Sequence, residues 1–419
     1  MPTVDLKYGR SGIPLEYDSG SMTLVGGGET RRPLSDAEIG VKFDEPIGAE
    51  PIENSISPGQ SVLLVVPDAT REVGCGQIVN LLVRRLIANG TNAFDIRIIF
   101  ATGIHRKVTD EEKAAILTPF IAQRIKILDH EPRDLTRIAR LGTTAGGIPV
   151  ELDRALIEHD HVIIIGGVSF HYFAGFTGGR KLICPGLAST RTISATHKLA
   201  FDCERLDRRA GVGTGILDGN AVHGSFVEAA SFAPPSFAVT TIVNDAGEIV
   251  DLFCGDWIES HRAACDRYAE AHTVDLSEKR PLVVVSCGGS PHDINMIQAH
   301  KSLDAAASAC IDGGTIILVA ECPDGLGRSD FLDWFAAADS RELAVRLCEK
   351  YQVNGQTAFS LLQKTERFDV GIMTSLSDEM IGKMRFRRVT ELDNEIEKAA
   401  SKSGYIITNG ARSMLRIRQ

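Results

Sequence analysis

The sequence predicts an α/β protein of two domains with mainly parallel sheets. Short apolar runs rich in β-branched residues alternate with longer stretches of helical character along the whole chain. Fully apolar strands are typical of parallel sheets, whose two faces are covered by helices. The 419 residues also exceed what one ordinary core accommodates. In such folds ligands bind at the carboxyl ends of strands, so we expect an active-site cleft between the domains.

The expected strands and helices alternate in chain order. Eight apolar runs are predicted as strands: residues 61–66, 96–101, 162–166, 238–243, 282–286, 315–320, 370–374 and 405–409. Five stretches are predicted as helices: residues 76–88, 110–117, the segment after 186, 257–272 and 340–351. Thr109-Asp-Glu-Glu112 resembles a capping box, because the acid three residues after the threonine can bond back to its backbone.

A polar stretch at residues 274–280, just before Pro281, indicates the boundary between the domains. A strand followed by Gly-Gly starts again directly after it, at residues 283–289. We therefore expect an N-terminal cofactor-binding and catalytic domain at residues 1–275. The C-terminal α/β domain would cover residues 276–419, and its last residues could return to the first domain.

The composition favours a cytoplasmic enzyme. The formal net charge is −10, which disfavours general binding to nucleic acid or to an anionic membrane. The first residues lack the basic-then-apolar pattern of a secretion signal, and no apolar run is long enough to span a membrane. The nine cysteines lack Cys-x-x-Cys spacing, so neither a zinc knuckle nor a disulfide framework is indicated. This pattern fits a reducing compartment.

Residues 171–197 form the most informative segment. Lys181 follows a Gly-Gly turn, and His171 and His197 lie on either side of it. A lysine offers an amine for a covalent or charge contact, and histidines offer acid, base or metal ligation. The turn itself could instead be an ordinary anion site made of backbone N–H groups. His197 could be the single protein ligand of a metal that a cofactor largely chelates, or simply a helix histidine.

Three further motifs follow strands or open a helix. Arg71, after the first strand, could clamp a carboxylate or be a surface charge. His105, in the turn after the second strand, is by itself more typical of a cap or core group than of a catalyst. Gln298 and Lys301 are three residues apart on an expected helix, so they share a face and could bind a carboxylate. A solvated face is the usual alternative.

Taken together, four segments resemble the nickel-dependent lactate racemase family, and the resemblance extends over most of the chain. The block from His171 to His197 matches in residue type and spacing, which makes it the most specific of the four. The segments are Asp68-Ala-Thr-Arg71, Ala101-Thr-Gly-Ile-His105-Arg106, His171 to His197 with Thr177-Gly-Gly-Arg-Lys181, and Gln298-Ala-His-Lys301.

The resemblance implies a nickel-pincer nucleotide, a pyridinium mononucleotide whose two sulfur arms hold nickel. Lys181 would be its covalent tether and His197 the protein ligand to nickel. The turn formed by Thr177, Gly178, Gly179 and Arg180 would lie beside this cofactor, and we expect its N–H groups to serve the nucleotide phosphate. Separate cofactor-maturation proteins would be partners, because they build and insert the group.

The family's reaction is the racemisation or epimerisation of a 2-hydroxy acid by reversible hydride transfer through a 2-keto acid. The resemblance assigns the alternating acid and base roles to His105 and His171. Arg71, Gln298 and Lys301 would hold the substrate carboxylate while the ketone reorients.

The sequence departs from the lactate-type members at two positions. Ile297 stands where those members carry an aromatic residue before the glutamine, and Gln356 aligns near an active-site tryptophan. A pocket without these two aromatic side chains would be wider or more polar. We therefore predict a substrate that is larger or more polar than lactate.

Three other classes of protein stay open on the residues alone. His105, His171 and His197 could jointly bind zinc or iron in a lyase or hydrolase. Lys181 could form a Schiff base with pyridoxal phosphate. The Gly-Gly-Arg-Lys turn could also belong to a non-catalytic binder of an anionic metabolite.

Overall fold

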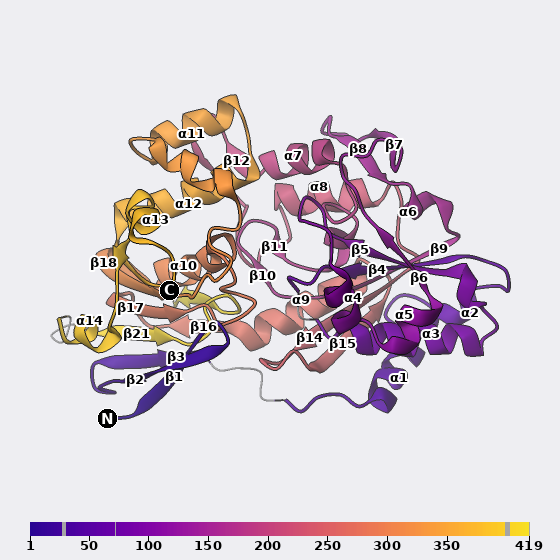
Figure 1. Ribbon diagram of the computed structural model, residues 1–419, viewed down its shortest axis with the longest axis horizontal. Coiled ribbons are helices and arrows are strands. Elements are labelled where there is room, and N and C mark those ends of the chain that lie inside the picture. Colours follow the sequence, from indigo (N-terminus) through magenta and orange to yellow (C-terminus); the bar gives the residue numbers. More distant parts are fainter. Residues whose placement is uncertain (27–30, 72, 399–402, 419) are drawn as a thin grey trace. The chain divides into compact units, whose positions relative to one another are not determined.

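The computed structural model describes residues 1–26, 31–71, 73–398 and 403–418 (Figure 1). It contains two compact units. The central unit comprises Glu29–Leu199 and Gly211–Tyr268, and the C-terminal unit comprises Met1–Gly28, Ala200–Ala210 and Ala269–Gln419. This division differs from the single boundary expected between residues 275 and 276. The chain crosses between the units several times, because its first residues and a short internal segment belong to the C-terminal unit.

The central unit is built on a six-stranded sheet with the order β15-β14-β9-β4-β5-β6. All neighbours are parallel except β14 and the edge strand β15. Every residue of β4 is buried, as expected for a strand covered on both faces. The strands are β4 (Val62–Pro67), β5 (Ile96–Ala101), β6 (Lys126–Asp129), β9 (His161–Gly167), β14 (Phe237–Val243) and β15 (Ile249–Gly255).

Nine helices belong to the described part of this unit, and two of them carry clear sequence signals. α4 begins with the predicted capping box, in which Thr109 and Glu112 bond to each other's backbone. α3 buries its apolar face against the sheet, from Cys75 to Leu86. The helices are α1 (Asp36–Asp44), α2 (Ile52–Ser55), α3 (Cys75–Ala88), α4 (Asp110–Ile116), α5 (Pro119–Arg124), α6 (Ala155–Glu158), α7 (Thr190–Lys198), α8 (Ala221–Ala230) and α9 (Glu259–His272), whose last residues enter the C-terminal unit.

The central unit also contains two short hairpins. They are β7 (Ile138–Thr143) with β8 (Pro149–Asp153), and β10 (Phe170–His171) with β11 (Gly175–Phe176).

The C-terminal unit contains a second six-stranded sheet, with the order β20-β19-β18-β17-β21-β3 and all neighbours parallel. The indigo β3 lies beside the yellow β21 in Figure 1, so the first residues of the chain extend a sheet made by the last ones. The strands are β3 (Met22–Val25), β17 (Arg280–Ser286), β18 (Cys310–Val319), β19 (Asp369–Met373), β20 (Arg387–Arg388) and β21 (Gly404–Ile407).

Helices and small strand pairs complete this unit. The helices are α10 (Met296–Ala309), α11 (Ser340–Glu349), α12 (Val353–Arg367), α13 (Asp378–Lys383) and α14 (Leu392–Lys398), with the 3-10 helix η3 (Ser329–Ala336). The strand pairs are β1 (Thr3–Tyr8) with β2 (Ser11–Glu16), β12 (Phe201–Asp202) with β13 (Asp207–Arg208), and β16 (Thr273–Leu276) with β22 (Met414–Ile417).

All eight expected strands and all five expected helices are present, most of them within two residues of the expected ends. The mixed α/β class with mainly parallel sheets is therefore confirmed. No helix in the described ranges has both the length and the apolar character needed to cross a bilayer.

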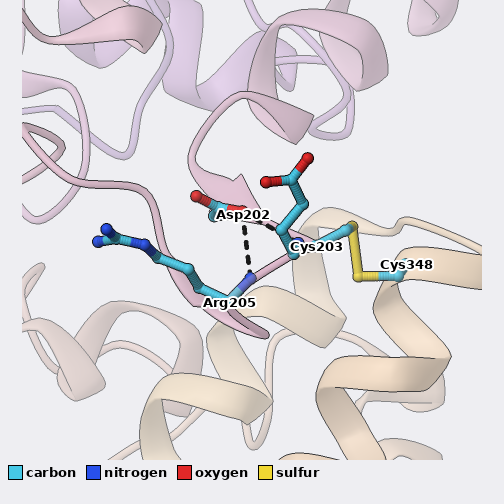
Figure 2. The surroundings of a disulfide bond; sticks show 5 residues. Asp202, Cys203, Arg205 and Cys348 are labelled. Carbon is cyan, nitrogen blue, oxygen red and sulfur yellow. Dashed lines mark hydrogen bonds between the residues drawn. A yellow bond between two sulfur atoms is a disulfide. The ribbon is translucent and has the colours of Figure 1, made fainter.

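The internal segment Ala200–Ala210 is tied to the C-terminal unit by side chains of several kinds. The Phe201 ring lies 5.0 Å from that of Phe359. Figure 2 shows the disulfide that joins Cys203 to Cys348 of α11. The cysteine spacing indicated no disulfide framework, so this single bridge was not expected from the sequence. Its partners are 145 residues apart, so no local spacing could reveal them.

Candidate functional site

The first group of candidate residues lies where β4 and β5 end. These strands are parallel neighbours with Pro67 opposite Ala101, so the loops that follow them meet at one edge of the sheet. Asp68 follows β4 directly, and His105 lies in the turn after β5. The His105 Nδ1 atom is 2.7 Å from Oδ2 of Asp68. The structure thus joins two motifs that are far apart in the sequence.

The Asp68 carboxylate is buried and fully engaged. Its Oδ1 accepts hydrogen bonds from the Thr70 backbone N–H (3.0 Å) and hydroxyl (2.5 Å). Burial raises the pKa of Asp68, but the hydrogen bonds from His105 and Thr70 and the positive charge of Arg71 outweigh it and lower the pKa to about 2. Asp68 is therefore a carboxylate at neutral pH and accepts the Nδ1–H of His105. This leaves Nε2 of a neutral His105 ring as a proton acceptor, on a side chain that is 47% exposed.

Arg71 lies in the same loop, and its backbone N–H donates to the Asp68 carbonyl at 3.2 Å. Burial lowers the pKa of the Arg71 guanidinium, while the Asp68 charge opposes this shift. A guanidinium held beside this acid–histidine pair is placed to attract an anionic group. The sequence motif containing Asp68 was noticed, but its link to His105 was missed. An acid directly after one strand and a histidine after the adjacent parallel strand is the signal that could have revealed it.

The second group lies in the segment that follows β9. His171 ends β10, and its buried ring contacts the Phe173 ring edge-on, with centroids 4.4 Å apart. The Ala174 backbone N–H donates to Nδ1 of His171 at 3.2 Å. Nδ1 is therefore an acceptor, so a neutral His171 ring carries its proton on Nε2. The two candidate acid–base histidines are thus held in opposite tautomers.

The Gly-Gly turn before Lys181 can only be made by glycines. Gly178 and Gly179 have φ values of 73° and 53°, in the left-handed region that disfavours side chains. A Cβ on Gly179 would come within 2.6 Å of the His261 ring, and one on Gly178 within 2.8 Å of the Gly167 carbonyl. Thr177 anchors the turn, since its hydroxyl donates to the same carbonyl at 3.0 Å. Lys181 follows in the 3-10 helix Gly179–Leu182 (η2).

The structure brings Lys181 and His197 together against the same two aromatic rings. The Lys181 Nζ atom lies 5.7 Å from the ring centroids of both Phe173 and Phe226. The His197 ring, on α7, lies 5.3 Å from each of the same two rings. An amine and an imidazole 16 positions apart in the sequence therefore share one aromatic surface.

His197 is held as a neutral imidazole in one tautomer. Its Nδ1–H donates to the Ile193 carbonyl at 2.8 Å, and Nε2 makes no hydrogen bond to any described residue. Burial and the charge of Lys181 lower the pKa of His197 to about 3, although the bond to Ile193 opposes them. A neutral imidazole with one nitrogen fixed by a carbonyl and a lone pair on the other is the usual form of a metal-binding histidine.

The alternative of a three-histidine metal site is not supported. Within the ranges that the structure describes, no three side chains of His, Cys, Asp or Glu converge so that they could hold a metal ion.

The side chain of Arg180 is more deeply buried than that of its neighbour Lys181. Its side chain is only 1% exposed, and the guanidinium points to the protein interior, where Nη2 donates to the Ala174 carbonyl at 2.7 Å. The expectation that Arg180 lies beside a bound cofactor stays a prediction.

The remaining candidates belong to the C-terminal unit. Gln298 and Lys301 lie together on α10, where the Lys301 Nζ donates to Oε1 of Gln298 at 2.5 Å. Ile297, before them, is partly buried against the core of the unit. Gln356, on α12, is buried and its Oε1 accepts a hydrogen bond from the Tyr351 hydroxyl.

Comparison with known proteins gives one consistent match. Residues 8–207 match the family described as the lactate racemase N-terminal domain, and residues 276–410 match the lactate racemase C-terminal domain. The lactate racemase of Lactiplantibacillus plantarum is 30% identical over 96% of each chain. That of Thermoanaerobacterium thermosaccharolyticum is 29% identical over 80% of this chain and 78% of its own.

Two solved structures have the same fold as this chain. The lactate racemase apoprotein from T. thermosaccharolyticum superposes with a TM-score of 0.89 at 25% identity, covering 99% of this chain and 100% of its own. A Thermotoga maritima protein shares the fold, with a TM-score of 0.72 at 19% identity over 92% of this chain and 99% of its own.

Proposed function

The chain belongs to the lactate racemase family, and on this premise we propose that it is an isomerase that racemises or epimerises a 2-hydroxy acid. The observation that carries the proposal is the arrangement in the segment after β9. Lys181 and a neutral His197 lie against the same two phenylalanine rings, and His171 contacts one of these rings. Groups suited to be a covalent tether, a metal ligand and an acid–base catalyst thereby lie in one segment, which supports the proposal.

We propose that Lys181 carries a nickel-pincer nucleotide and that His197 is a ligand to its nickel. The residues fit this group. His197 offers an unprotonated Nε2, and imidazole combined with sulfur donors would suit nickel. The Gly178–Gly179 turn presents backbone without side chains one residue before the lysine. When bound, the nucleotide supplies the acceptor for the hydride that leaves the substrate Cα.

The protein's own part in the reaction is to move the hydroxyl proton. The Nε2 atom of His105 can accept it, and the Asp68 carboxylate stabilises the imidazolium that results. The Nε2–H of a neutral His171 can donate a hydrogen bond to the substrate oxygen when this oxygen reaches that side. For racemisation in both directions the two rings would exchange these roles, and His171 would take a proton at Nε2 only in the tautomer that carries its hydrogen on Nδ1.

Substrate binding would rest on the cationic and amide side chains. We propose that Arg71, Gln298 and Lys301 hold the carboxylate, since charge-assisted hydrogen bonds of this kind anchor a carboxylate while the rest of the molecule turns. Ile297 and Gln356 are the positions expected to admit a substrate larger or more polar than lactate.

The test is to produce the chain together with cofactor-maturation proteins and to assay it. Intact mass and nickel content report the cofactor, and chiral chromatography reports the interconversion of lactate, malate, larger aliphatic hydroxy acids and aldonates. We expect a covalent adduct, bound nickel and a preferred substrate other than lactate. A strong preference for lactate would overturn the prediction about the substrate. A nickel-loaded protein that interconverts no 2-hydroxy acid would overturn the proposed function.

Replacing Asp68 by asparagine tests the support of His105. Asp68→Asn removes the charge that stabilises the His105 imidazolium, and a hydrogen bond to a charged group is worth about 1.5–3 kcal/mol. The turnover number should therefore fall by about 10- to 100-fold. Asp134→Asn is a matched control, because Asp134 holds Thr136 in the same kind of turn (3.0 and 2.6 Å) but has no histidine partner. Unchanged turnover in a folded Asp68→Asn variant would contradict the role of Asp68.

A further inference from the structure

Arg180 is a buried cation without a counterion. It is the largest of the fully buried side chains, and no carboxylate in the described ranges pairs with it. Burial lowers the pKa of Arg180 to about 10, so the guanidinium is still charged at neutral pH. Burying an unpaired charge is costly, and a chain retains such a group where its hydrogen bonds perform a task.

The hydrogen bonds of Arg180 all serve one loop. Nη2 donates to the Ala174 carbonyl at 2.7 Å, and Nη1 donates to the Gly178 carbonyl at 3.4 Å. Arg180 therefore connects both ends of the stretch that runs from the β10–β11 hairpin to the Gly-Gly turn. A charged donor forms stronger bonds to carbonyl oxygens than a neutral one does, particularly away from water.

A second buried side chain holds the same loop from α9. The His261 ring packs against Gly179, and its Nε2–H donates to the Thr177 carbonyl at 2.8 Å. Burial and the neighbouring charge of Arg180 lower the pKa of His261 to about 3, so the ring is neutral and adds no second charge. Nη1 of Arg180 lies 3.2 Å from the same Nε2. Because this Nε2 carries the proton given to Thr177, it does not accept from Arg180, and the carbonyls of Ala174 and Gly178 hold the guanidinium.

The residue that Arg180 holds is also the one that contacts His171. Ala174 accepts from Arg180 through its carbonyl and donates to Nδ1 of His171 through its N–H at 3.2 Å. The N–H of Ala174 favours the neutral His171 tautomer that carries its proton on Nε2. If Ala174 shifted, Nδ1 would lose its donor, and the ring could adopt the other tautomer.

We propose that Arg180 is a positioning residue that fixes the tautomer of His171 through Ala174, and that it does not contact the substrate. The buried guanidinium orders the loop, the loop orders the Ala174 peptide, and this peptide keeps the His171 proton on Nε2. Only the effect on turnover rests on the proposed function; the effect on the tautomer does not.

The test compares Arg180→Lys and Arg180→Met with the unaltered protein, all free of cofactor. ¹⁵N-labelled histidine resonances distinguish the tautomers, and His171→Gln identifies the signals of His171. We expect the unaltered protein to show a single Nε2–H tautomer at neutral pH and both variants to show a mixture. Arg180→Lys keeps the charge but loses the planar fork whose two nitrogens reach Ala174 and Gly178, so it remains informative if Arg180→Met does not fold. Arg262→Met removes an arginine that pairs with Asp218 at the surface, and it should leave His171 unchanged.

The loaded enzyme gives an independent readout. In the Arg180 variants kcat should fall about 10- to 100-fold with little change in KM, because an acid–base group is mispositioned while the carboxylate contacts remain. An unchanged His171 tautomer in a folded Arg180→Lys variant would overturn the inference, whatever its activity. If the tautomer changes but no variant racemises any substrate, the inference about Arg180 stands and the proposed function fails.

Discussion

Replacing His105 or His171 by glutamine should abolish racemisation while nickel remains bound. General acid–base catalysis by a positioned side chain contributes about 10²- to 10⁴-fold, and both rings act on the same hydroxyl proton. Neither histidine is the expected nickel ligand, so metal content should not change. The measurement is the rate of interconversion of each enantiomer, together with the nickel content of the same preparation.

His159→Gln provides the control for these two variants. His159 is a partly buried histidine of the central unit whose Nδ1 bonds to the Ala155 carbonyl at 2.8 Å. It precedes β9, at the opposite end of this strand from the candidate site, and should be replaceable without loss of rate. Full activity of either His105→Gln or His171→Gln would contradict the assignment. Loss of nickel in either variant would show that the residue supports the cofactor instead.

The regular elements could be predicted because their signals are local. A run such as Val62–Pro67 is apolar throughout, and this pattern by itself indicates a strand buried on both faces. β3 carries no such signal, since it has only four residues, and its partner β21 is nearly 400 positions later in the chain. The first residues belong to the C-terminal unit because of this pairing. The sequence shows no sign of the pairing, so it predicted one boundary between the two domains.

The candidate site was predicted as a set of residues but not as a set of contacts. His105 and Asp68 meet because β4 and β5 are adjacent and parallel. Neither sequence motif by itself indicates that the two strands are neighbours. Arg180 and Lys181 are adjacent in a cationic motif, and the sequence predicted both beside the cofactor, with Lys181 as its tether and Arg180 in the turn. In the structure the 3-10 turn separates them, with Arg180 in the interior and Lys181 near Phe173. The division of labour within the motif is therefore a property of the fold.

Replacing Lys181 by alanine should eliminate the covalent cofactor. The expected tether is the Lys181 amine, so an intact mass of Lys181→Ala produced with the maturation proteins should lack the adduct, and racemisation should be lost with it. Lys181→Arg is the sharper variant, because it keeps a cation near Phe173 and Phe226 but offers no amine for the bond. It should also lack the adduct.

Lys198→Ala is the matched control for the tether. Lys198 is an exposed lysine next to His197 on α7, so its removal takes away one amine from the same region without touching the aromatic surface. We expect Lys198→Ala to keep both the adduct and the activity. An adduct that persists in Lys181→Ala would place the attachment at another residue. Peptide mapping of that adduct would then identify the true tether, because the mass of a modified peptide includes the attached group.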